Sequence, residues 1–260
     1  TYLTADAMVA FLRTNKVIED LFSVRPHLEL MKRSLGLLQF LAKAKQLTSA
    51  DVKFIWNASN TSHEATVEEV YKLLGTLAND LQPELQHEVF SYVRAIPTGD
   101  LNKLTLALLK DLALAGGDPA GACLNAVNLL WELTKDGTPL ADDLAELAQT
   151  QLEKVVADSR HADWRTDFIA RCITNISASK SQSQSWRLLK CIFNAFPNKA
   201  GEDNKNPRAV LINKLNEESN LMEVVFADLQ RYNAAAAEAV IPDRPGPLPT
   251  PGPSAREVAE

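Results

Sequence analysis

The sequence predicts an all-α protein, an armadillo- or HEAT-like helical solenoid of about 11 or 12 helices followed by a disordered, proline-rich tail. Three observations predict this fold class. Apolar residues recur at helical spacing up to about residue 233, no segment shows the sustained two-residue alternation of strands, and paired helices recur roughly every 35 to 41 residues. We therefore expect a helical-repeat domain over residues 1–240 and a flexible tail or linker over residues 241–260.

Short helices open the chain. The segments "TADAMVAFLRTN" and "VIEDLF" form a first pair. The next segment, residues 27–45, is expected to be one helix, because Pro26 suits a first helical turn and the apolar residues that follow lie on a single stripe. That stripe consists of Met31, Leu35, Leu38 and Leu41.

Polar residues mark the starts of the next two helices. Thr48 followed by Asp51, and Thr61 followed by Glu64, both have the form of a capping box. The second of these helices then carries an apolar stripe of Val67, Val70, Leu74 and Leu77.

The remaining helices follow in pairs. They are expected near residues 83–95, 100–114, 120–134, 140–157, 161–178, 182–196, 206–217 and 220–238. Pro83 and Asp100 suit helix starts, "GGDP" at 116–119 breaks the chain, and 198–208 is typical of a flexible loop. The pairs begin near residues 48, 83, 120 and 161, which is the spacing of a solenoid.

Two tryptophans occupy similar places in these pairs. Trp56 and Trp131 each close a first helix and precede a polar loop, so we expect the indoles to wedge paired helices together. A core position is favoured for them and for Trp164 and Trp186, and an exposed binding anchor is the alternative. Tetratricopeptide repeats are disfavoured, because their Trp, Leu-Gly and Tyr pattern is absent.

Composition limits the function. The chain has 260 residues, of which 46% are hydrophobic, and a formal charge of -6, so nucleic acids and anionic membranes are disfavoured partners. Three widely spaced cysteines cannot form a complete disulfide framework, and the apolar runs are too short to span a bilayer. We expect an intracellular, cytoplasmic location. Since the chain starts at Thr1 and stops in a polar tail, we expect a fragment of a longer protein.

No motif in the sequence predicts an active site, a nucleotide-binding loop or a metal site. We therefore expect no catalytic, cofactor-binding or metal-binding residues and no cofactor. The four histidines lie far apart, at His27, His63, His87 and His161. The three cysteines lie on or beside apolar stripes and are expected to be buried structural residues: Cys123, Cys172 and Cys191. Adjacent acidic pairs such as Asp142 and Asp143 point in different directions on a helix and are expected to be solvated. In the tail, Pro242 to Pro245 forms a P-x-x-P, for which a linker is favoured over a ligand.

Four stretches carry a family resemblance. Residues 37–84 resemble the long helical region upstream of the catalytic domain in ubiquitin-specific proteases of the fat-facets type, and "LT...IW", "HEA" and "NLLW" are the most specific segments. Residues 11–22 and 124–156 are also similar, and 210–232 more weakly. Residues 158–205 match less clearly, and the tail has no counterpart.

The resemblance implies a parent that is a large intracellular cysteine protease, which removes ubiquitin from protein substrates. The family's cysteine and histidine boxes are absent from this segment, so the segment itself is expected to be non-catalytic. It would hold partners or ubiquitinated substrates along a solenoid face, first of all along the second helices of the pairs, such as 62–78 and 140–157. A free-standing adaptor without a protease, and an enzyme contained wholly in these residues, are the alternatives. The oligomeric state is left open.

Overall fold

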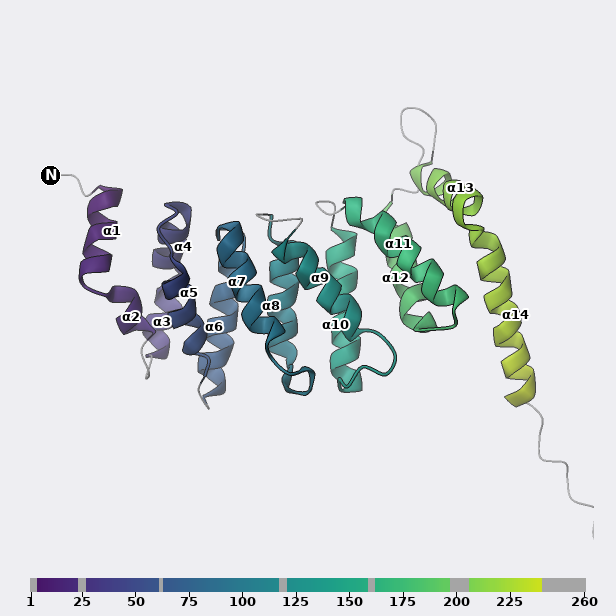
Figure 1. The fold of residues 1–260 in the computed structure, drawn as a ribbon, viewed down its shortest axis with the longest axis horizontal. Helices are drawn as coiled ribbons and strands as arrows, with labels where there is room; N and C mark the ends of the chain where they lie inside the picture. The colour runs from purple at the N-terminus through teal and green to yellow at the C-terminus, as the bar shows by residue number, and fades with distance from the viewer. Residues whose placement is uncertain are drawn as a thin grey trace, which may run out of the picture. The chain divides into compact units, whose positions relative to one another are not determined.

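The computed structural model describes residues 4–22, 27–60, 63–116, 121–158, 162–196 and 206–239. Within these ranges all regular secondary structure is helical, which confirms the predicted fold class (Figure 1). The chain divides into two compact units, Thr1–Arg208 and Ala209–Glu260. The proline-rich tail, and most of the loop predicted at 198–208, lie outside the described residues.

The first unit contains the helical repeats. Its helices are α1 (Ala5–Thr14), α2 (Val17–Leu21), α3 (Leu28–Arg33), α4 (Leu35–Lys43), α5 (Ser49–Asn57), α6 (Glu64–Leu77), α7 (Pro83–Arg94), α8 (Lys103–Leu114), α9 (Ala122–Leu133), α10 (Asp142–Ala157), α11 (Ala162–Ser177) and α12 (Gln182–Ala195). The helix α13 (Pro207–Ser219) crosses the boundary between the units, and α14 (Leu221–Ala239) belongs to the second unit.

The described residues contain fourteen α-helices instead of the predicted 11 or 12. One extra helix arises because the segment 27–45 is broken at Ser34. The Ser34 hydroxyl is buried and donates a 2.7 Å hydrogen bond to the Met31 carbonyl, which a continuous helix would use for its own backbone.

Helix starts follow the predicted chemistry in two cases and depart from it in two. Pro83 is the first residue of α7, as predicted. The capping box of Thr48 and Asp51 is confirmed at the start of α5. Glu64, however, is the first residue of α6 after the N-cap His63, so it cannot take the third position that a box with Thr61 requires. The helix predicted from residue 100 begins at Lys103, because Asn102 provides the cap.

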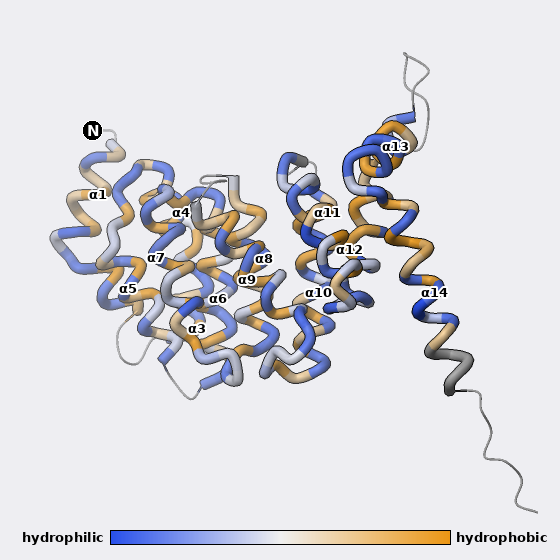
Figure 2. Tube along the Cα trace, turned by 45° about the vertical axis from the view of Figure 1, so that its right-hand side comes forward, coloured by the Kyte–Doolittle hydropathy of each residue, from blue (hydrophilic) through white to orange (hydrophobic). Residues whose placement is uncertain are grey.

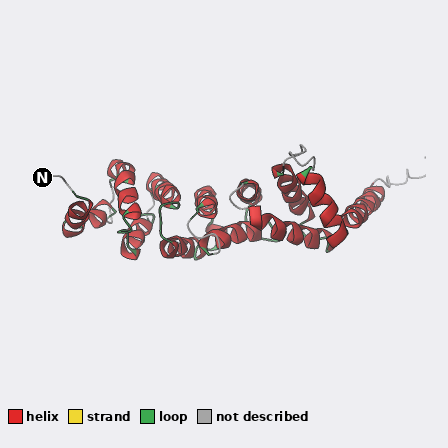
Figure 3. Cartoon of the chain, turned by 90° about the horizontal axis from the view of Figure 1, so that it is seen from above, coloured by secondary structure: helices red, strands yellow, loops and turns green. Residues whose placement is uncertain are grey.

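The repeats form two layers, which Figure 3 shows as two rows of helices. The first helices α5, α7, α9 and α11 begin at Ser49, Pro83, Ala122 and Ala162, so consecutive starts lie 34, 39 and 40 residues apart. Among the second helices, α6 packs on α8, α8 on α10, and α10 on α12. The first helix α9 packs against both α8 and α10, so successive repeats interlock.

Leucine and valine side chains fill the space between the layers. Residues such as Leu74, Leu109, Leu130 and Leu152 have no exposed surface. Along α6, α8 and α10 the chain alternates between apolar and polar residues, as expected for amphipathic helices with one buried side (Figure 2). Burial of each such side chain stabilises the fold by about 1.5 to 3 kcal/mol before chain entropy is considered.

The tryptophans connect repeats as well as paired helices. Trp131 is buried, which confirms its predicted core position, and meets Phe168 of α11 edge to face at 5.7 Å. Trp56 is half-buried and stacks between Tyr71 of its own pair, at 5.5 Å, and Tyr92 of the next first helix, at 5.4 Å. Each indole therefore contacts an aromatic ring about one repeat further along the chain. Trp164 and Trp186 are half-buried.

A glycine lets α6 and α8 approach closely. A methyl group on Gly75 would lie 2.5 Å from Oδ2 and 3.3 Å from Cβ of Asp111. We expect Gly75→Ala to lower the free energy of unfolding by about 1 to 2 kcal/mol in urea denaturation, despite the better helix propensity of alanine. Gly36→Ala, where no neighbouring atom lies within 4 Å, should instead raise it by about 0.5 kcal/mol. If Asp111→Ala does not rescue Gly75→Ala, the steric explanation is wrong.

A buried carboxylate ties the first helix to the repeats. Asp51 is 2% exposed and accepts hydrogen bonds of 2.6 and 2.7 Å from Arg13 of α1. Arg13 also donates to the Gln46 carbonyl, and the backbone and hydroxyl of Thr48 each donate to Asp51 at 2.8 Å. Burial raises the pKa of Asp51, whereas the hydrogen bonds from Arg13 and Thr48 lower it. The lowering effect is the larger one, so the pKa of Asp51 lies below its ordinary value.

This shift predicts a pH dependence of stability. Because the folded pKa of Asp51 is depressed, its contribution is complete above the ordinary carboxyl pKa and is lost as the pH falls below about 4. We expect Asp51→Asn to cost about 3 kcal/mol at neutral pH, and the difference from the wild type to shrink in acid. Urea denaturation of both proteins at several pH values measures this difference. A difference between Asp51→Asn and the wild type that is independent of pH would contradict the assignment.

No helix among the described residues combines the length and the apolar character that a membrane span requires.

Candidate protein-interaction surface

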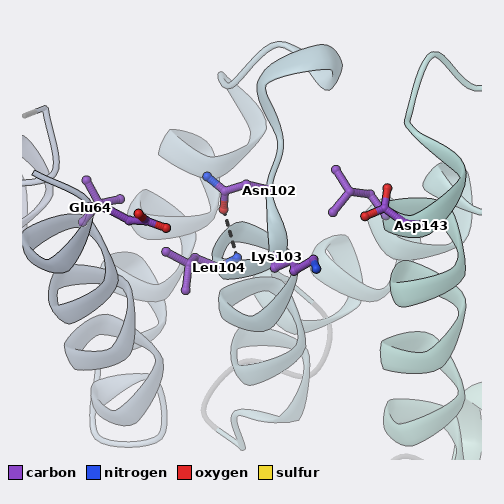
Figure 4. A pocket seen from close by; sticks show the side chains of 7 residues that line it. Glu64, Asn102, Lys103, Leu104 and Asp143 are labelled. Carbon is purple, nitrogen blue, oxygen red and sulfur yellow. Dashed lines mark hydrogen bonds between the residues drawn. The ribbon is translucent and has the colours of Figure 1, made fainter. Parts of the chain in front are cut away.

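The N-terminal ends of three neighbouring second helices line an open pocket of about 450 Å³ (Figure 4). We call it the apolar pocket. Its lining residues come from α6, α8 and α10 and from the residue before α8: Glu64, Val67, Asn102, Lys103, Leu104, Asp143 and Leu144. Since α8 packs against both α6 and α10, the pocket extends over three neighbouring helices of the layer of second helices.

Capping of α8 fixes the middle of this pocket. The Asn102 side chain accepts hydrogen bonds from the backbone N–H groups of Leu104, at 2.9 Å, and Thr105, at 3.0 Å. In return the Thr105 hydroxyl accepts from the Asn102 backbone at 2.7 Å. These reciprocal bonds hold the first turn of α8, so Lys103 and Leu104 are presented to the pocket from a rigid backbone (Figure 4).

The pocket combines an apolar lining with a charged rim. Val67, Leu104 and Leu144 are half-buried, and each comes from a different helix. Around them Glu64, Lys103 and Asp143 are exposed. A half-buried apolar surface with a polar rim is the usual composition of a protein-binding site.

A second pocket, of about 190 Å³, lies on the other side of α10, between α10 and α12. We call it the polar pocket. It is lined by Thr134, Asp142, Ala145, Glu146, Gln149, Ser183, Gln184 and Arg187. Asp136, in the loop after α9, holds the start of α12 by accepting hydrogen bonds from Ser181 N at 2.6 Å and from Gln184 Nε2 at 3.1 Å.

Most charges of the polar pocket are already paired. Arg187 forms ion pairs with Glu146, at 2.5 Å, and with Glu153, at 3.2 Å. The hydrogen bond to Glu146 is the main reason that the pKa of Arg187 is raised. The carboxylate of Asp142 has no such cation among the described residues.

Gln149 leaves one buried acceptor without a partner. The residue is 1% exposed, and its Nε2 donates to Glu153 at 2.9 Å and to the Gln184 carbonyl at 3.3 Å. Its Oε1 accepts no hydrogen bond from the described residues. An unsatisfied buried acceptor costs about 1 to 3 kcal/mol, so a hydrogen-bond donor that reaches it would be stabilised.

Two of the helices that line the pockets are ones that the sequence analysis expected to hold partners. The helices predicted to hold partners, 62–78 and 140–157, correspond to α6 and α10, which lie on either side of α8 in one layer. Asp142 and Asp143, expected to point in different directions, line different pockets. The sequence singled out neither Leu104 nor Gln149, because only the packing of helices about 40 residues apart brings these side chains to a pocket.

The three cysteines differ in burial. Cys123 and Cys172 are buried as predicted, whereas Cys191 is half-buried. Burial raises the pKa of Cys172 to about 12 and also raises the pKa of Cys191, so neither thiol ionises readily at neutral pH. In the part of the chain that the structure describes, no three His, Cys, Asp or Glu residues are grouped to hold a metal ion, and His161 lies outside that part.

Comparison with known proteins supports the resemblance found in the sequence. The chain is 28% identical over 246 residues to ubiquitin carboxyl-terminal hydrolase 9X of Mus musculus, an alignment that covers 89% of the chain and 10% of that relative. It is 28% identical over 249 residues to ubiquitin carboxyl-terminal hydrolase 9Y of Homo sapiens, covering 89% of the chain and 10% of the relative. It is 25% identical over 259 residues to the probable ubiquitin carboxyl-terminal hydrolase FAF of Drosophila melanogaster, covering 94% of the chain and 9% of the relative.

The chain thus spans about a tenth of the length of these relatives. The profile described as "UBP24/USP9X/USP9Y ARM repeat" matches residues 1–246, which include every helix described above. The predicted resemblance to the fat-facets type is confirmed, and the chain belongs to the UBP24/USP9X/USP9Y ARM-repeat family.

Proposed function

We propose that this chain is the non-catalytic helical-repeat region of a large ubiquitin-specific cysteine protease, and that it holds substrates or partner proteins on its layer of second helices. Family membership supports the first part, since the relatives are named ubiquitin carboxyl-terminal hydrolases. The two neighbouring pockets on α6, α8, α10 and α12 carry the second part.

The geometry suits protein partners better than small substrates. Both pockets are lined mainly by helices of one layer, so a partner can contact several repeats at once. The half-buried Val67, Leu104 and Leu144 provide apolar contacts, and the surrounding charges can select a partner by its charge.

Site-specific photo-crosslinking tests the binding surface. The photoreactive residue p-benzoylphenylalanine would replace Val67, Leu104 or Leu144 in the pocket, and Phe54 or Ser91, exposed residues of first helices, as matched controls. We expect partner proteins to crosslink from the three pocket positions and not from the controls. Equal crosslinking from both sets would contradict the proposed surface.

The protease assignment has its own test. The native protein, captured with an antibody against this chain, should hydrolyse a fluorogenic ubiquitin substrate and react with a ubiquitin-based probe for active-site cysteines. The isolated chain should do neither. A native protein that fails both assays would favour the alternative of an adaptor without protease activity.

A further inference from the structure

We propose that the apolar and polar pockets form two subsites of one groove, which binds an extended peptide segment carrying an apolar residue and, about three residues away, a basic residue. This inference rests on the proposed function and specifies the chemistry of the partner. The apolar side chain would enter the pocket of Leu104 and Leu144, and the basic side chain the pocket of Asp142 and Gln149.

The first turn of α10 joins the two subsites. Asp143 lines the apolar pocket and its neighbour Asp142 lines the polar pocket. The apolar pocket lies between α10 and the helices before it, and the polar pocket between α10 and α12, so the subsites are about one helix spacing, roughly 10 Å, apart. An extended chain in the polyproline II conformation advances about 3.1 Å per residue and completes a turn in about three residues, so side chains three residues apart face the same side and match that separation.

The charges of the groove favour a cation in the polar pocket. Glu64, Asp142, Asp143 and Glu146 line the two pockets, opposite Lys103 and Arg187. Arg187 is already paired with Glu146 and Glu153, so it does not neutralise Asp142. The groove therefore has an excess of negative charge, which attracts basic and repels acidic segments.

Gln149 provides an observation independent of these carboxylates. Its buried Oε1 lacks a donor among the described residues, and its amide lines the polar pocket. A lysine or arginine side chain supplies N–H donors, from which both a carboxylate and an amide oxygen accept hydrogen bonds. An acidic or purely apolar side chain cannot supply them, because neither carries a donor at neutral pH.

Peptide titration of the whole chain, followed by NMR of its amide groups, tests the proposal. The probe is an acetylated, amidated peptide containing Leu-Ser-Ser-Lys in a glycine and serine background, compared with peptides that carry norleucine or glutamate in place of the lysine. We expect the lysine peptide to shift the side-chain amide signal of Gln149 and the backbone signals near Leu144. The norleucine peptide should bind about tenfold more weakly, and the glutamate peptide more weakly still.

Variants assign the effect to the polar pocket. Asp142→Asn and Gln149→Met should each weaken the lysine peptide about tenfold and leave the norleucine peptide nearly unchanged. Asp163→Asn, an exposed acidic residue in the first turn of α11, is the matched control and should change neither. Asp142 is exposed, so its variant remains informative even if Gln149→Met unfolds the chain.

Three results would overturn the proposal: equal binding of the lysine and norleucine peptides, preference for glutamate, or signal changes away from both pockets. If partner proteins still crosslink from positions 104 and 144 in any of these cases, the proposed function stands. Only the preference for an apolar and a basic peptide residue is then rejected. Loss of the crosslinks as well would reject both.

Discussion

Replacing Trp131 with alanine is expected to lower the free energy of unfolding by about 3 to 5 kcal/mol. The indole is buried between α9 and α11 and meets Phe168 edge to face, and Arg171 in turn lies over the Phe168 ring, 5.0 Å from its centroid. Truncation leaves a cavity and removes the aromatic contact between two repeats. Urea denaturation followed by circular dichroism measures the loss.

Trp56→Ala is the matched comparison for this prediction. Trp56 also contacts the next repeat through an aromatic ring, but it is half-buried, so we expect a smaller loss of about 1 to 2 kcal/mol. A larger loss of unfolding free energy for Trp56→Ala than for Trp131→Ala would show that burial does not determine how much these indoles stabilise the fold. Unchanged stability in both variants would mark both as surface anchors.

Arg165→Ala is expected to cost about 3 kcal/mol. Arg165 of α11 is 6% exposed and caps the end of α10, because its guanidinium donates to the carbonyls of Val156 at 3.0 Å, Ala157 at 2.8 Å and Asp158 at 3.2 Å. It also lies over the Phe196 ring, 5.3 Å from the centroid. Its loss would leave the final carbonyls of α10 without these donors.

Two variants separate capping from packing. Arg165→Met keeps most of the aliphatic bulk without the donors, and we expect it to lose most of the stability that Arg165→Ala loses. Arg165→Lys should recover part of it, since one ammonium cannot reach all three carbonyls in the planar geometry of a guanidinium. A methionine variant as stable as the wild type would show that packing, not capping, is the contribution of Arg165.

Much of the fold could be predicted because it follows from local signals. Helical periodicity located the repeats, and the Thr48 and Asp51 box marked the start of α5 correctly. The break at Ser34 was missed because this serine lies within a strong apolar stripe, and the pattern does not show that its hydroxyl bonds to the Met31 carbonyl. The predicted Thr61 and Glu64 box was wrong because several polar residues precede α6, and His63 takes the capping position.

Features that depend on distant residues could not be predicted from one segment at a time. The sequence analysis did not single out Arg165, because its acceptors lie at the end of the preceding helix. The apolar pocket likewise needs Leu104 and Leu144, which lie one repeat apart in the sequence and line the same pocket only because α8 packs on α10. Aligning the repeats would have shown that the first turns of the second helices are equivalent. It would not have shown that these turns line a pocket.

We propose above that the layer of second helices binds partner proteins. The most direct test takes a partner identified by photo-crosslinking and measures its affinity for the purified chain and for two variants, Leu104→Glu and Ser91→Glu. The first adds a charge to the apolar pocket, and the second adds the same charge to an exposed position on α7. We predict that Leu104→Glu weakens binding at least about tenfold and that Ser91→Glu does not. Unchanged affinity for Leu104→Glu, or equal losses for both variants, would contradict the claim.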